Sequence, residues 1–185
     1  MENLQLVFPE IFLSLSIMFL LILGVFKKNS SKLIQNISQL ILLVTAVITF
    51  NETISISEAK LFSNSVIIDY LSSFMKIITL LAAFLALVIS SNYLKIFNIF
   101  KIEYPILILS SVLGMMIMIS SNDLIVFYMG LELQSLALYV LATFNRDQIK
   151  SSEAGLKYFV LSALSSGLLL YGCSLIYGFT GSTNF

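Results

Sequence analysis

The sequence predicts an all-α protein, a polytopic membrane helical bundle with about six transmembrane helices. Of its 185 residues, 58% are hydrophobic and 11% are charged, and the mean hydropathy is +1.00. Soluble domains carry roughly a quarter of charged residues. Six stretches supply the ~20 mostly apolar residues that a helix needs to cross a bilayer. The longest polar stretch between them, 51–65, is too short to bury the core of a soluble domain.

The predicted helices follow one another with short connections. The second is the most polar, because Gln35, Asn36 and Gln39 dilute it. We therefore expect that helix to pack against others rather than to face lipid on all sides. The predicted ranges are 7–26, 32–50, 69–94, 104–120, 123–144 and 153–180.

The helix ends carry residues typical of helix starts. Pro9 and Pro105 fall in the first turns of the first and fourth helices, where a missing N–H is harmless. Glu10 and Glu103 place an acid at the positive end of the dipole of the same helices. Comparable N-terminal residues mark the third, fifth and sixth helices: Asp69, Asp123 and the run Ser151, Ser152, Glu153.

Basic residues are distributed unevenly among the loops and predict the orientation in the membrane. Loops on the cytoplasmic side carry an excess of lysine and arginine. The second loop holds only Lys60 and the fourth holds none, so both ends of this stretch are expected to face the periplasm or the intermembrane space. The first apolar segment is expected to be a retained span, because its basic residues follow it instead of preceding it. The first, third and fifth loops hold Lys27, Lys28, Lys32, Lys95, Lys101, Arg146 and Lys150.

Composition excludes several classes of chemistry. The formal net charge is zero and there is no long basic run, so nothing indicates a nucleic-acid partner. The chain has one cysteine, Cys173, and no histidine, which excludes a disulfide framework and a Cys/His metal site. We expect no bound metal and no cofactor-binding residue. Chemistry must come from carboxylates, lysines, tyrosines and hydroxyls.

One carboxylate lies inside the fifth predicted helix. Glu132 stands nine residues after Asp123. At 1.5 Å per residue it lies ~13 Å into the helix, near the middle of a ~30 Å hydrocarbon core. A charge at this depth costs at least ~2.5 kcal/mol on insertion scales, and such residues usually face a bundle interior and are functional. Four hydrogen-bonding side chains share its helical face: Tyr128, Ser135, Tyr139 and Thr143.

Two interpretations of Glu132 stay open. In one, a protonated Glu132 makes a structural polar contact between two helices. In the other, it exchanges protons and is balanced by a nearby cation. Lys157 on the sixth helix is the obvious cation, but it lies ~10 Å shallower, so a direct pair is stretched. Lys157 either belongs to a proton relay or snorkels to the cytoplasmic side, and Lys76, near the outer end of the third helix, is expected to snorkel.

From Glu103 onward the sequence carries specific motifs. GLELQSLALYVL is followed by EAGLKYFVLSALSSG, and FPEIFLS and VIIDYLSSFMK occur nearer the start. The chain resembles the NADH dehydrogenase subunit 2 (chain N) family, the antiporter-like membrane subunits of proton-pumping NADH:quinone oxidoreductase (respiratory complex I). The match runs over about 80 residues without a gap. The Gln-Ser-Leu-Ala-Leu-Tyr continuation fits this family better than the multisubunit sodium/proton antiporters.

The resemblance implies a subunit of fourteen helices, with both termini outside and two inverted repeats. Residues 1–103 would form an N-terminal three-helix region, and 104–185 the first three helices, four to six, of the first repeat. It implies that Glu132 pairs with a lysine on helix seven and that Lys157 belongs to the same polar axis. The subunit would bind no redox cofactor, since quinone and NAD are used by the whole complex. Expected partners are other complex I membrane-arm subunits and membrane lipid, in a bacterial or mitochondrial inner membrane.

The departure from the family is length. The sequence stops before helix seven, so the lysines expected on helices seven, eight and twelve are absent. It is expected to be an incomplete part of a longer chain, or else a split-gene product whose partner chain carries the remaining helices. The predicted function is proton translocation coupled to electron transfer from NADH to quinone. The alternatives are a structural scaffold or assembly piece of the membrane arm, and a cation/proton antiporter component.

Overall fold

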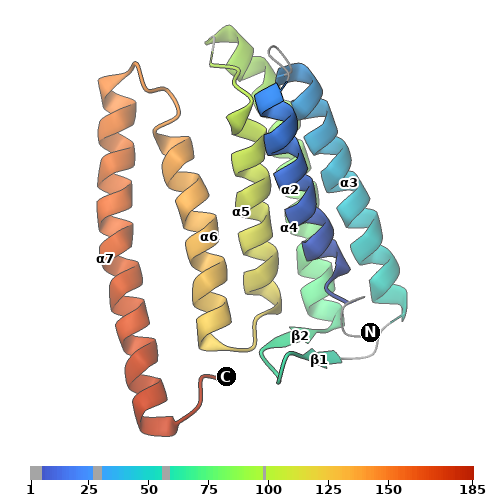
Figure 1. The fold of residues 1–185 in the computed structure, drawn as a ribbon, viewed down its shortest axis with the longest axis vertical. Helices are drawn as coiled ribbons and strands as arrows, with labels where there is room; N and C mark the ends of the chain where they lie inside the picture. Colours follow the sequence, from blue (N-terminus) through green and yellow to red (C-terminus); the bar gives the residue numbers. More distant parts are fainter. Residues whose placement is uncertain (1–5, 27–30, 56–58, 98) are drawn as a thin grey trace.

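The computed structural model describes residues 6–26, 31–55, 59–97 and 99–185, with the backbone alone for 53–55 (Figure 1). Six long helices and one two-stranded antiparallel hairpin form in this part of the chain. The helices are α2 Phe8–Phe26, α3 Ser31–Ser55, α4 Tyr70–Ile96, α5 Glu103–Ser120, α6 Leu124–Ala142 and α7 Ile149–Thr180, and the strands are β1 Ala59–Leu61 and β2 Val66–Ile68.

The predicted fold class is confirmed. Each of these helices is long and apolar enough to cross a membrane, and five of them begin within a residue of the predicted start. The predicted start of the last helix is wrong. α7 begins at Ile149, and Ser151 lies inside its first turn, where its hydroxyl donates to the Ala142 carbonyl at 2.8 Å. Ser151 therefore ties α7 to the end of α6, and the run does not cap α7.

Helices α2, α3, α4 and α5 pack around one apolar core, while α6 lies beside α5 and α7 beside α6 (Figure 1). α7 is the least covered helix, since of its residues only Gly155 and Ser166 are buried in the described structure. The core is therefore built by the first four helices, and α6 and α7 form an outlying layer. Fully buried members of the core are Leu13, Leu20, Ile34, Leu42, Leu80, Leu87, Leu109, Val112 and Met116.

The polar helix α3 packs against α4 with part of its polar face: Gln35 is buried, Gln39 is partly buried and Asn36 is exposed. Gln35 is buried, and its amide Nε2 donates to the Leu87 carbonyl of α4 at 2.9 Å. Thr45 and Ser38 are also buried and donate to carbonyls of their own helix. Because buried polar groups must be hydrogen-bonded, these side chains belong at the contact with other helices and not at lipid.

Two glycines set the distance between α5 and α6. A Cβ atom on Gly114 would lie 2.6 Å from the backbone N of Gln134 and 2.7 Å from the carbonyl O of Gly130. A Cβ on Gly130 would lie 2.9 Å from the backbone N of Met118. Small residues allow two membrane helices to approach this closely. This contact holds α6, the helix that carries Glu132, against the core.

The β-hairpin lies at the end of the bundle where α2 begins and α7 ends (Figure 1). Its turn contains three non-glycine residues with positive φ, Phe62, Ser63 and Asn64. Asn122, in the α5–α6 connection, donates from its side chain to the Asn64 carbonyl and from its backbone to the Ser65 carbonyl, both at 2.8 Å. No strand was predicted here, because this turn lacks the glycine or proline that usually marks a hairpin.

Asp123 caps α6 and fixes its start, as predicted. One carboxylate oxygen accepts from the backbone N–H groups of Ile125 at 2.8 Å and Val126 at 3.2 Å, and the other accepts from the Thr183 hydroxyl. The Leu124 N–H also donates to the Thr183 carbonyl at 2.8 Å. Burial by itself would raise the pKa of Asp123, but these three hydrogen bonds outweigh it and hold the pKa below its usual value.

We expect the α6 cap to weaken in acid. The pKa of Asp123 in the folded protein lies below the unfolded value of about 3.9, so its stabilisation is complete above about pH 5 and is lost as the pH falls through the folded pKa. Loss of a cap costs about 1 kcal/mol. Hydrogen exchange at the Ile125 and Val126 amides, corrected for intrinsic rates, measures this opening. Asp123→Asn keeps a capping oxygen without titrating, and an identical pH dependence in both proteins would contradict the prediction.

The described basic loop residues gather at the opposite end of the bundle. The α4–α5 and α6–α7 connections lie at the same end (Figure 1) and contain Lys101 and Arg146. Lys60, on β1, lies at the other end. Lys27 and Lys28 lie outside the described residues. The charge separation between the two ends, on which the predicted orientation rests, is therefore present in the fold.

Candidate functional site

Glu132 lies on α6, eight residues after its first residue. The residue is partly buried, and its carboxylate oxygen Oε2 is buried without a hydrogen-bond partner among the described residues. An unpaired buried carboxylate oxygen is costly, especially in a membrane. Within the described part of the chain, nothing therefore satisfies this oxygen as a structural polar contact would.

Part of the predicted polar face of α6 lies toward α7. This face, the polar stripe, consists of Tyr128, Glu132, Ser135, Tyr139 and Thr143. Ser135 and Tyr139 line a pocket of about 130 Å³ between α6 and α7, where the other polar lining groups are Tyr158 and three serines of α7. Tyr139 is buried, and its ring meets the Tyr158 ring edge-on with centroids 4.9 Å apart. The pocket has room for a few water molecules. The serines of α7 that line it are Ser162, Ser165 and Ser166.

The other three residues of the polar stripe do not line this pocket, and two of the stripe hydroxyls bond within α6. The hydroxyls of Ser135 and Thr143 donate to backbone carbonyls of their own helix, those of Leu131 and Tyr139 respectively. Tyr128 is partly buried, and Glu132 does not line the pocket. The structure thus brings Ser135 and Tyr139 together opposite α7, and places Tyr128, Glu132 and Thr143 outside that pocket.

Lys157 does not reach Glu132. Its ammonium Nζ lies 2.6 Å from Oε1 of Glu153, one turn earlier on α7, and the two side chains are 68% and 57% exposed. No ion pair between Lys157 and Glu132 forms within the described residues. The prediction that a direct pair is stretched agrees with this geometry. Exposed i,i+4 pairs contribute little energy, so Lys157 is free to change partner.

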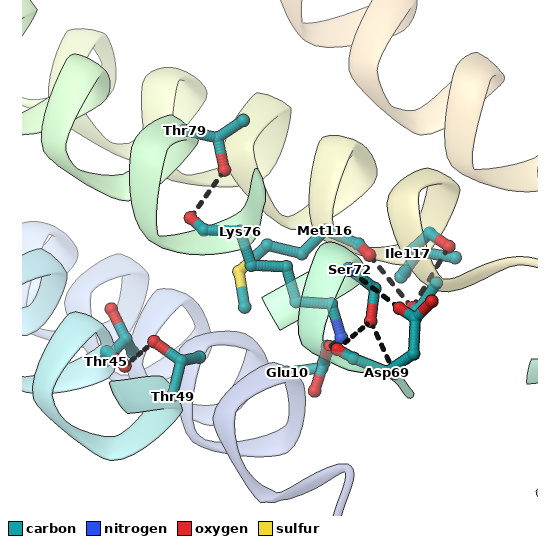
Figure 2. Close-up of polar contacts among 10 residues, drawn as sticks. Glu10, Thr45, Thr49, Asp69, Ser72, Lys76, Thr79, Met116 and Ile117 are labelled. Carbon is teal, nitrogen blue, oxygen red and sulfur yellow. Dashed lines mark hydrogen bonds and ion pairs between the residues drawn. The ribbon is translucent and has the colours of Figure 1, made fainter. Parts of the chain in front are cut away.

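The sequence did not predict a buried ion pair at the end of the bundle opposite the start of α7. Nζ of Lys76 on α4 lies 2.6 Å from Oε1 of Glu10 on α2, and their side chains are only 3% and 9% exposed (Figure 2). Glu52 of α3 is close enough to interact electrostatically with both. The expectation that Lys76 snorkels is therefore wrong, because a buried carboxylate lies within reach and satisfies its charge inside the bundle.

The buried pair lies beside the start of α4. Figure 2 shows Lys76 and Glu10 pointing toward one another beside the first turn of α4, where Asp69 accepts from the Ser72 N–H at 2.7 Å and the Ser72 hydroxyl accepts from the Asp69 N–H at 2.9 Å. This capping box confirms the predicted role of Asp69. The second oxygen of Glu10, Oε2, is buried and has no hydrogen-bond partner in the described part of the chain.

One sequence signal could have found the pair. Glu10 and Lys76 each stand alone as a charge in an apolar stretch, two and six residues after the start of helices that begin at the same end of the bundle. Opposite charges inside one membrane bundle commonly pair. What the sequence lacked was the knowledge that α2 and α4 bring these two faces together. Among the described residues, no cluster of three His, Cys, Asp or Glu side chains forms a metal site.

Comparison with known proteins places Glu132 and Lys157 in a matched segment. Residues 121–185 match a family described as NADH:quinone oxidoreductase/Mrp antiporter, TM. The whole chain is 68% identical to NADH-quinone oxidoreductase subunit N of Pelagibacter ubique (strain HTCC1062), and covers 39% of that protein. The chain is homologous to the N-terminal part of subunit N. The subunit N of Maricaulis maris (strain MCS10) is 51% identical over all of this chain, which covers 38% of it.

Solved structures agree with this relationship. A chain of respiratory complex I from Thermus thermophilus, with bound aureothin, is 26% identical; the match covers 95% of this chain and 38% of that one, with a TM-score of 0.80. A chain of an archaeal membrane-bound sulfane sulfur reductase shares the fold, with a TM-score of 0.82 at 22% identity over 97% of this chain and 38% of that one. The chain spans about two-fifths of the length of its subunit N relatives. The resemblance predicted from the motifs is confirmed.

Proposed function

We propose that the chain forms the N-terminal part of a membrane-arm subunit of proton-pumping NADH:quinone oxidoreductase. In this role it contributes to proton translocation coupled to electron transfer from NADH to quinone. The observation that carries the proposal is the homology to subunit N over the whole chain, at 68% identity to one relative. The matched family segment contains a carboxylate at membrane depth, Glu132, with an unpaired buried oxygen.

Glu132 is the proposed proton-exchanging group. Its unpaired oxygen can take a proton or meet a cation, and either event changes the charge inside the bundle. Lys157 is a secondary member of the relay, because its exposed pair with Glu153 is weak enough to break. Ser135 and Tyr139, with the pocket between α6 and α7, offer hydroxyls and room for water beside this path. Tyr128 and Thr143 complete the polar stripe.

The assembly follows from the same proposal. Residues 1–103 form an N-terminal three-helix region and 104–185 begin an antiporter-like repeat. Other membrane-arm subunits, lipid and the remaining helices, in the same or a separate chain, are the partners. The chain holds no redox cofactor of its own, and quinone and NAD act elsewhere in the complex. The named relatives come from bacteria, which supports a bacterial inner membrane, with the ends of this stretch in the periplasm.

Replacing Glu132 by glutamine tests the proposal. Glu132→Gln keeps shape and hydrogen bonding but cannot ionise, so quinone-linked proton pumping per assembled complex should fall at least about tenfold, as on loss of a proton-transfer group. The measurement is the initial rate of acidification by purified complex in liposomes, normalised to the amount of complex. Glu153→Gln, which removes a carboxylate from the exposed pair on α7, is the matched control and should keep most of the pumping.

The other outcomes decide between the alternatives. Pumping that persists in Glu132→Gln while the amount of assembled complex falls would support a scaffold or assembly role. That role is favoured by one observation, the buried Glu10–Lys76 pair that ties α2 to α4. Cation/proton exchange by the purified protein in liposomes without any redox partner would instead support an antiporter component.

A further inference from the structure

A pocket at the lysine-rich end of the bundle combines an apolar wall with charged groups. It has a volume of about 260 Å³ and lies between α2, α5 and the last turn of α6. Apolar side chains from all three helices line it, and its charged members are Lys101, Glu103 and Arg146. Two of the charges are positive and one is negative. The apolar lining residues include Leu21, Ile106, Leu107, Val140 and Phe144.

The charges of this pocket are not used within the described structure. Two ion pairs form among the described residues, and neither includes Lys101, Glu103 or Arg146. Lys101 and Arg146 are exposed and flank the membrane-spanning segments, in the connections before α5 and after α6. They are therefore placed at the level where lipid phosphates lie, while Leu21, Leu107 and Val140 lie within the spanning segments.

We propose that this pocket binds an anionic phospholipid with a hydroxyl-bearing headgroup, of the phosphatidylglycerol type. The phosphate would lie between Lys101 and Arg146, and an acyl chain would follow the apolar wall between α2, α5 and α6. Basic pockets between membrane helices at the interface bind anionic headgroups. The lining carries a net charge of +1, which a headgroup with one negative charge neutralises. The Glu103 carboxylate accepts hydrogen bonds from the headgroup hydroxyls.

The charge balance separates this lipid from a zwitterionic one. Phosphatidylethanolamine carries no net charge, so it would leave the excess positive charge of the pocket uncompensated. A free phosphate would use the two cations but leave the apolar wall exposed. Only a lipid with a negative headgroup fits both the apolar wall and the charged residues Lys101, Glu103 and Arg146.

Native mass spectrometry of the protein, purified in detergent with the chains that accompany it, tests the proposal. The probes are phosphatidylglycerol and phosphatidylethanolamine of matched acyl chains, titrated separately. A cation at a membrane surface contributes about fivefold in affinity for anionic lipid, so the double variant Lys101→Gln/Arg146→Gln should bind phosphatidylglycerol about thirtyfold more weakly. Val140→Phe fills the apolar wall without changing charge and should also weaken binding; Val140 is 44% exposed, so the fold has room for it.

The control removes the same charge from the same end but outside the pocket. Lys95→Gln/Lys150→Gln takes away two cations that do not line it, and phosphatidylglycerol binding should stay near that of the unaltered protein. Equal weakening by both double variants would mean diffuse attraction to a basic surface and would overturn the proposal. Equal binding of phosphatidylglycerol and phosphatidylethanolamine would also overturn it. So would the absence of any bound lipid, which is the result expected if another protein segment fills the pocket.

Discussion

Replacing Lys76 by methionine is expected to destabilise the bundle by about 3 to 5 kcal/mol, the usual cost of removing one partner of a buried ion pair. Methionine keeps the length and apolar stem of the lysine but leaves the Glu10 carboxylate buried without its cation and near the acidic Glu52. The Glu10 and Lys76 side chains are only 9% and 3% exposed, so bulk water solvates the remaining charge poorly. The free energy of unfolding in mixed detergent micelles measures the effect.

The chain offers a matched control for this prediction. Lys157→Met breaks a pair with the same 2.6 Å distance but with 68% and 57% exposed side chains, and should cost at most about 1 kcal/mol. The double variant Glu10→Gln/Lys76→Met removes both charges and should recover most of the loss. If Lys76→Met cost no more than Lys157→Met, the buried pair would not stabilise the bundle.

Replacing Gly114 by valine is expected to separate α5 from α6. The new Cβ would lie 2.6 Å from the backbone N of Gln134 and 2.7 Å from the carbonyl O of Gly130, and neither atom can move without its helix. Overpacking costs about 1 to 3 kcal/mol, and the upper part of that range applies where backbone must shift. The expected result is a lower unfolding free energy, together with faster proteolysis of the α6–α7 connection.

A substitution at Gly167 on α7 is expected to change the unfolding free energy in the opposite direction. No atom of another described segment lies within 4 Å of a Cβ built on Gly167, so Gly167→Ala adds no clash there. Alanine is a better helix former than glycine by up to about 1 kcal/mol, and the variant should be neutral or more stable. A Gly114→Val protein as stable as Gly167→Ala would show that the close crossing of α5 and α6 is not needed for the fold.

Much of the candidate site was predictable, because the rise of a helix is fixed. The position of Glu132 in an apolar stretch gives its depth once the start of α6 is known, and Asp123 marks that start. The polar face of α6 follows from the helical period. The direction in which that face points did not follow, and Ser135 and Tyr139 were found opposite the serines of α7 only in the structure.

The misjudged residue, Lys76, shows where such predictions fail. A lone lysine near a helix end can snorkel or pair, and both choices satisfy its charge locally. The choice depends on Glu10, which is 66 residues away in sequence. Similarly, Gly114 and Gly130 are ordinary glycines in their own helices, and the need for glycine arises only where the two backbones cross.

The sequence by itself determined that the chain crosses a membrane, where its helices begin and end to within a few residues, and which loops share an end. These properties depend on hydropathy, helix signals and charge along short stretches, so each is local. The tertiary structure decided which charges pair, which glycines meet another backbone and which side chains share a pocket. Those contacts join residues from different helices, and they form only when packing has set the rotation and height of each helix.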